Sequence, residues 1–184
     1  MRHLMPAAAL LLALGPAAAQ DYPAKPITIV VPAAAGGPTD TISRITALAM
    51  SKLLGQQILI ENVGGAGGTI GTTRAVRAEP DGYTLLIYHV GLSTAATLYR
   101  KLPYDTRQAF TSIGLVTDAP MTIIARNDYE PNTLKELIDH LKKPGVKASM
   151  GNAGVGSASH LCGMLFLSET KVRSTPCRIA APAR

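Results

Sequence analysis

The sequence predicts an α/β protein built on an open sheet of parallel strands. Three observations predict this fold class. Residues 27–31 form a continuous apolar, β-branched run, which is typical of a parallel strand buried on both faces. Strand and helix patterns then alternate three times, and a loop of small residues follows each strand. Right-handed crossovers would gather these loops at the carboxyl ends of the strands, where such sheets bind ligands.

The amino terminus has the features of an export signal, which we expect to span residues 1–19. Arg2 provides a basic start, residues 4–14 are apolar, and a run of three alanines ends at Ala19. The apolar stretch is shorter than the about 20 residues that cross a bilayer, and an uncleaved membrane anchor is the alternative. We expect cleavage near Ala19 and a soluble, periplasmic mature chain.

The first domain is expected to cover residues 20–118. Pro38 suits the first position of a helix and Gly55 suits its end. The apolar residues expected on one face of this helix are Ile42, Ile45, Ala49 and Leu53. The elements predicted in order are a strand at 27–31, the helix from Pro38, a strand at 57–61, a helix at 69–78 and a strand at 84–88.

Residues 119–170 are expected to begin a second α/β domain. Two short apolar runs, at 112–117 and 121–125, are predicted to be strands that cross between the domains. The elements predicted after them are an amphipathic helix at 133–142, a strand at 147–150 and a helix from 158 to about 168.

The balance of charge excludes a nucleic-acid-binding function. The formal net charge is +6, but residues 20–170 hold 13 Lys and Arg against 12 Asp and Glu. A basic stripe interleaved with aromatic residues is absent from the sequence. The histidines and cysteines are scattered, so we expect neither a metal nor a cofactor. Cys162 and Cys177 alone are weak evidence for a disulfide, and the pairing of Cys162 stays open.

Three glycine-rich loops, at residues 32–38, 64–68 and 151–157, are the candidate binding features. Glycine allows the backbone to come close to a ligand. The N-terminus of the helix that follows offers unpaired N–H groups and the positive end of the helix dipole. Together they form an anion site without a charged side chain. For any one loop, a simple tight turn is the alternative.

Enzymatic alternatives fail on detail. Ile70, just after the second loop, and Ser159, just after the third, stand where a dinucleotide-binding fingerprint has its last small residue, and no Lys-Ser or Lys-Thr pair forms a P-loop. Ser157 and His160 could share a helix face, but no orienting acid or oxyanion hole is evident. We therefore expect a binding protein and not an enzyme. An α/β enzyme that uses the loops for a phosphate or cofactor is the alternative.

Two polar residues near the loops have two interpretations each. Asp40 lies in the first turn of its helix, where an acid stabilises the helix dipole, and it could also meet a ligand amine or hydroxyl. His89 follows the third strand and is either a wall of the cleft or a buried histidine. Tyr83, Tyr99 and Tyr104 are interpreted as packing residues.

Five segments, taken in order, resemble one family. They are YPAKPITIVV with GGPTD, then ENVGGAGGT, PDGYTLL, LYRKLPYD and GVGSASHL, within residues 21–170. Each segment is loosely specific alone, but the five together resemble the Bug-type (TctC-like) receptors. Members of this family are the solute-binding proteins of tripartite tricarboxylate transporters.

The resemblance implies a periplasmic-binding-protein clamshell of type II-like form, with two open α/β domains that close on a small carboxylate. It also implies membrane transporter subunits as partners, a monomeric receptor and no enzymatic activity. Residues 35–40 and 64–69 would hold the ligand from the first domain, and the third loop from the second. The candidate ligand-binding residues are Gly36, Gly37, Thr39, Asp40, Gly67, Gly68, Thr69, His89, Gly156, Ser157 and His160.

One departure from the family concerns residues 171–184, which are basic and aperiodic. We expect the resemblance to be truncated after about Thr170, the second domain to be incomplete and ligand capture to be impaired. A receptor that binds the same ligands but docks to a sensor kinase is an alternative role.

Overall fold

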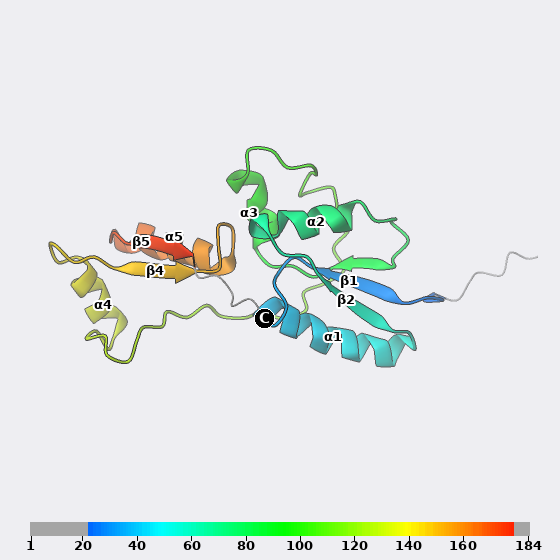
Figure 1. Ribbon diagram of the computed structural model, residues 1–184, viewed down its shortest axis with the longest axis horizontal. Helices are drawn as coiled ribbons and strands as arrows, with labels where there is room; N and C mark the ends of the chain where they lie inside the picture. Colours follow the sequence, from blue (N-terminus) through cyan, green and yellow to red (C-terminus); the bar gives the residue numbers. More distant parts are fainter. Residues whose placement is uncertain (1–21, 179–184) are drawn as a thin grey trace, which may run out of the picture.

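The computed structural model describes residues 22–178, and these form two α/β units joined by an extended connector (Figure 1). The expected export signal lies outside the described residues. The first unit is a parallel sheet of three strands, β1 (Ile27–Val31), β2 (Ile58–Asn62) and β3 (Thr84–Leu86), in the order β2-β1-β3. β1 pairs in parallel with both neighbours, as the buried β-branched run predicted.

Helices cover both faces of this sheet. Helix α1 (Pro38–Leu54) packs on β1 and β2, and α2 (Thr69–Val76) packs on β1 and β3. Figure 1 shows α1 on one face, with α2 and α3 (Gly91–Leu98) on the other. Four residues of β1 therefore lose all exposure to solvent, and these are Ile27, Ile29, Val30 and Val31. Helix α3 was not predicted from the sequence patterns.

The packed face of α1 differs from the predicted one. The helix begins at Pro38 and ends at Gly55, whose φ of 65° caps it in the left-handed region, as expected. However, Ile45 and Leu53 are 66% and 86% exposed, whereas Ser43 and Ala47 are buried. Small side chains let the helix axis come close to the sheet, and the larger apolar residues consequently face outward.

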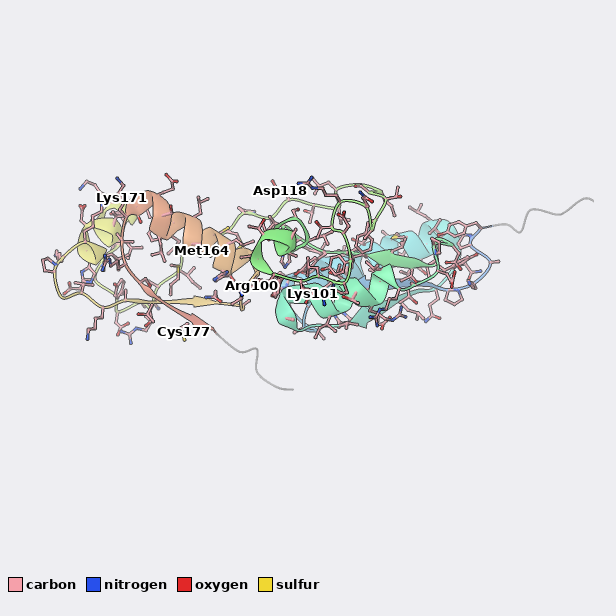
Figure 2. All side chains as sticks on the ribbon, turned by 90° about the horizontal axis from the view of Figure 1, so that it is seen from above. Arg100, Lys101, Asp118, Met164, Lys171 and Cys177 are labelled. Carbon is pink, nitrogen blue, oxygen red and sulfur yellow. The ribbon has the colours of Figure 1, made fainter. Side chains whose placement is uncertain are left out.

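The connector lacks the two strands that were predicted in it. Residues 112–117 and 121–125 are not strands, and the described residues 99–133 contain no α-helix or β-strand. Every residue from 111 to 128 is exposed, and Asp118 lies on this connector (Figure 2). A strand needs a neighbour for its N–H and C=O groups. No strand in the described part of the chain pairs with this segment.

The second unit contains two helices and a parallel pair of strands. Its elements are α4 (Leu134–Leu141), β4 (Ser149–Asn152), α5 (Ala158–Thr170) and β5 (Thr175–Arg178). Thr133 caps α4, because its hydroxyl accepts a hydrogen bond from the Glu136 N–H. Met164 lies on α5 and Cys177 on β5 (Figure 2).

The fold also continues past the expected end at Thr170. β5 pairs in register with β4, from Ser149 opposite Thr175 to Asn152 opposite Arg178, and Val172 is buried. Regular structure therefore extends beyond Thr170, through β5 to Arg178. Hydropathy periodicity gave no signal for β5, because a strand of four residues is too short to show one. None of the helices within residues 22–178 is long and apolar enough to cross a membrane.

Candidate functional site

The three predicted glycine loops meet at the carboxyl ends of the strands. A Cβ placed on Gly64 would lie 3.6 Å from the backbone of Ala33, so the first and second loops are neighbours. A Cβ on Gly156 would lie 3.9 Å from the Cα of Gly67, so the third loop, which comes from the second unit, reaches the second loop. The site therefore lies between the two units, at the starts of α1, α2 and α5.

The first loop is organised around the carboxylate of Asp40. This residue is 2% exposed, and its side chain points into the protein. Oδ2 accepts hydrogen bonds from the Gly36 N–H at 2.7 Å and from Arg44 Nε at 3.0 Å, and Oδ1 accepts one from Asn62 Nδ2 at 3.0 Å. The carboxylate thus ties the loop to α1 and to the end of β2. Both oxygens of Asp40 therefore have protein donors as partners.

The electrostatics of this cluster keep Asp40 ionised. The hydrogen bond from Arg44 is the largest influence and lowers the pKa of Asp40, while burial opposes it. The hydrogen bonds from the Gly36 N–H and from Asn62 lower the pKa further. Because Arg44 is committed to Asp40 and to the Asn62 amide oxygen, its guanidinium already has two protein partners.

The other first-loop candidates offer backbone groups. Gly37 is the N-cap of α1 and is half-buried, whereas Gly36 is exposed. Thr39 lies in the first turn, where its carbonyl accepts a hydrogen bond from the Ser43 hydroxyl at 2.7 Å.

The second loop forms a short 3-10 turn, η1 (Ala66–Gly68), directly before α2. The Thr69 hydroxyl donates to the Ala66 carbonyl at 2.9 Å. The Tyr88 hydroxyl donates to the Gly67 carbonyl. A Cβ on Gly68 would collide with the Tyr88 hydroxyl, so this ring packs against a residue without a side chain. Burial raises the pKa of Tyr88 to about 12, so the phenol stays protonated and remains a donor.

His89 lies half-buried between β3 and α3. Its Nδ1 accepts a hydrogen bond from the Gly91 N–H at 3.0 Å, and its ring packs against Tyr88 with centroids 4.3 Å apart. Burial lowers the pKa of His89, which favours the neutral imidazole. Since Nδ1 accepts a hydrogen bond, the neutral ring carries its proton on Nε2.

The third loop leads into α5. The Ser157 side chain caps this helix by accepting a hydrogen bond from the His160 N–H at 3.2 Å. His160 Nδ1 accepts a weak hydrogen bond from the Gly156 N–H at 3.4 Å. His160 therefore contacts the loop backbone, whereas the Ser157 hydroxyl contacts the first turn of α5 and lies 3.1 Å from the Ser159 hydroxyl.

The chemistry of the site is that of neutral donors. The loop residues 33–37, 64–68 and 154–157 contain no charged side chain. Each loop precedes a helix, whose first N–H groups and dipole favour a negative charge. No cluster of His, Cys, Asp and Glu in the described residues could hold a metal ion. The arrangement can accept an anion by hydrogen bonding.

Comparison with known proteins identifies the family. The family model described as "Tripartite tricarboxylate transporter family receptor", TctC, matches residues 42–178. The chain belongs to this family. The match extends through β5, beyond the expected end of the resemblance at Thr170.

TctC relatives match most of this chain. A protein from the TAR-I ttuE-ttuC' intergenic region of Agrobacterium vitis is 49% identical over 170 residues, which cover 91% of this chain and 49% of that protein. BugT of Bordetella pertussis is 34% identical over 173 residues, covering 91% of this chain and 53% of BugT. The chain thus spans about half the length of the curated relatives it matches.

Solved TctC-like structures confirm the predicted periplasmic-binding-protein fold. The periplasmic binding protein BugD superposes with a TM-score of 0.79 at 49% identity, over 87% of this chain and 54% of BugD. MatC from Rhodopseudomonas palustris, solved with malate, superposes with a TM-score of 0.78 at 38% identity, over 87% of this chain and 55% of MatC. Rpa4515 of R. palustris, solved with adipate, superposes with a TM-score of 0.72 at 29% identity, over 88% of this chain and 54% of Rpa4515.

Sequence reasoning missed four residues of this region. Asn62 and Tyr88 are polar residues at or just past the carboxyl ends of strands, and that position was the available signal. Gly91 opens a helix that was not predicted. Tyr99 was interpreted as a packing residue, yet its hydroxyl reaches Val155 of the second unit at 3.5 Å. No local pattern could reveal that contact, because it depends on how the two units meet.

Proposed function

We propose that this TctC-family chain is a periplasmic solute-binding receptor that captures a small carboxylate for a tripartite tricarboxylate transporter. The observation that carries the proposal is the meeting of three uncharged glycine loops, each followed by a helix, at the carboxyl ends of the strands. Malate and adipate in the two R. palustris structures name the ligand class with which to begin.

The uncharged loops favour binding over catalysis. Ser157 caps α5 and the His160 ring accepts a hydrogen bond from Gly156, so the two side chains lack the nucleophile–base arrangement that an acyl transfer requires. Backbone N–H groups bind a carboxylate through directional hydrogen bonds and not through an ion pair. We therefore expect selection for oxygen geometry and ligand length within the class of small carboxylates.

Isothermal calorimetry and thermal shift on the purified chain test this proposal. Malate and adipate should bind and raise Tm by mass action, and their diamides, which keep the length but lose the charge, should not. ATP and inorganic phosphate are the counter-probes for the enzyme alternative. Stabilisation by ATP alone would overturn the carboxylate proposal.

Location and partner need separate tests. We expect the mature chain in the periplasmic fraction to begin at Gln20 by intact mass. Cross-linking in cells should capture integral membrane transporter subunits, and capture of a sensor kinase in their place would favour the signalling role.

A further inference from the structure

The two units approach each other closely where backbone of the third loop meets two glycines. Carbonyl oxygens of the third loop approach two glycines of the first unit. A Cβ on Gly67 would lie 2.5 Å from the Val155 oxygen, and a Cβ on Gly91 would lie 2.9 Å from the Gly156 oxygen. Real Cβ atoms do not approach oxygens this closely, so the contact exists only because both positions are glycine.

The side chain of Tyr99 bridges the two units at this contact. Tyr99 follows α3 in the first unit, and its hydroxyl lies 3.5 Å from the Val155 oxygen, at the long end of hydrogen bonding. The same hydroxyl would collide with a Cβ on Gly67 and would lie 3.7 Å from a Cβ on Gly156. Tyr99 therefore covers the place where the two loops meet.

The surface beneath Tyr99 is held in shape from within the first unit. Tyr88 donates to the carbonyl of Gly67, and the hydroxyl of Thr72 donates to the carbonyl of Gly68 at 2.9 Å. Both residues lie in the first unit, so these two hydrogen bonds do not involve the second unit. The hydrogen bond from Tyr99 to Val155, in contrast, joins the two units.

We propose that Tyr99 latches the two units together by donating its hydroxyl to the Val155 carbonyl, with Gly67 and Gly91 as the surface on which the third loop lands. Tyr99 is thus a positioning residue, and Gly67 serves closure of the cleft. This inference rests on the proposed receptor function only for its effect on ligand affinity, because the docking contact can be measured without ligand.

The first experiment compares Tyr99→Phe with Tyr83→Phe by amide hydrogen exchange of residues 154–157 in the ligand-free chain. Tyr83 is the matched control, because its hydroxyl accepts a hydrogen bond from the Ala24 N–H within the first unit. The net value of one neutral hydrogen bond corresponds to about threefold to tenfold in an equilibrium constant. We expect exchange to accelerate by that factor in Tyr99→Phe and to be unchanged in Tyr83→Phe.

A second pair of variants tests the landing surface. In the Tyr99→Phe background, Gly67→Ala loses its collision with the Tyr99 hydroxyl and meets the Val155 oxygen across the interface. Gly55→Ala in the same background is the control, because its φ of 65° is close to the 59° of Gly67 and open space surrounds it. Only Gly67→Ala should accelerate the amide exchange of residues 154–157 beyond the rate seen in Tyr99→Phe.

Stopped-flow kinetics with malate and adipate supply the functional readout. Because a latch acts on the closed complex, Tyr99→Phe should raise the dissociation rate about threefold to tenfold for both ligands and leave the association rate unchanged. If neither ligand binds the unmodified chain, the receptor proposal fails and the exchange data still decide the latch. Equal exchange of residues 154–157 in Tyr99→Phe and Tyr83→Phe would overturn it.

Discussion

Asp40→Asn is the perturbation that most directly tests how the first loop is built. The carboxylate accepts three hydrogen bonds, from the Gly36 N–H, Arg44 Nε and Asn62 Nδ2, at 2.7 to 3.0 Å. An asparagine keeps the volume but has one oxygen in place of two. Its NH2 group would face either the Asn62 amide donor or the two donors at the former Oδ2.

The magnitude follows from these contacts. A hydrogen bond to a charged group contributes about 1.5–3 kcal/mol and a neutral one about 1 kcal/mol, and a buried donor left without a partner costs about 1–3 kcal/mol. Asp40→Asn removes the negative charge of the acceptor from all three bonds and turns an NH2 group toward at least one donor. Arg44 is 56% exposed and can be hydrated, which reduces the loss. We expect the free energy of unfolding to fall by about 2 kcal/mol.

The pH dependence gives a second signature of the same cluster. The hydrogen bond from Arg44 lowers the pKa of Asp40 in the folded chain below its usual 3.8. The unfolded chain therefore takes up the proton first as the solution is acidified. The advantage of Asp40 over Asn should be complete above pH 3.8 and should shrink as the pH falls through the folded-state pKa.

Urea unfolding followed by far-UV circular dichroism measures both effects. Asp81→Asn is the matched control, because Asp81 also accepts a backbone N–H and a cationic side chain but is exposed at the surface. Asp81→Asn should lower the free energy of unfolding much less than Asp40→Asn does. The reasoning fails if the two variants unfold at the same urea concentration, or if the loss at Asp40 is the same at pH 3 as at pH 7.

Three further predictions concern single residues of the site. Gly68→Ala should destabilise the chain by about 2 kcal/mol or more, because its φ of 89° strains any Cβ and the Tyr88 hydroxyl occupies the Cβ position; Gly55→Ala, which carries the φ strain alone, should cost about 1 kcal/mol by the same urea assay. Ser157→Ala should cost about 1 kcal/mol through loss of the α5 cap, and Ser157→Thr should restore most of it. Burial lowers the pKa of His89, so the stability gained from its neutral imidazole should be fully present above pH 6.5 and should decline as the pH falls toward the folded-state pKa. His89→Gln should remove that decline when Tm is followed from pH 8 to 5.

The local signals were sufficient for most of the first unit. A continuous β-branched run is typical of a parallel strand buried on both faces, and this run forms β1. Pro38 and Gly55 bound α1 because the φ of proline suits a helix start and glycine adopts the left-handed region at the helix end. Ordered motifs were specific enough to identify the receptor family, which the family match confirmed.

The expected core face of α1 and the predicted strands at 112–117 and 121–125 were wrong for related reasons. Apolar periodicity shows that a surface avoids water and does not show which neighbour covers it. Ile45 and Leu53 face solvent on α1, and residues 111–128 are exposed because the described chain provides no strand beside them. Pairing and burial depend on segments distant in sequence.

The sequence by itself determined most elements of the first unit, the three glycine loops and the family. Only the tertiary structure decided what the side chains around those loops do. Asp40 turns inward because Arg44 and Asn62, from different elements, converge on its carboxylate. Tyr99 reaches Val155 because the two units meet at glycines. Propensity and periodicity act between near neighbours along the chain, whereas the Asn62–Asp40 and Tyr99–Val155 contacts join residues 22 and 56 positions apart.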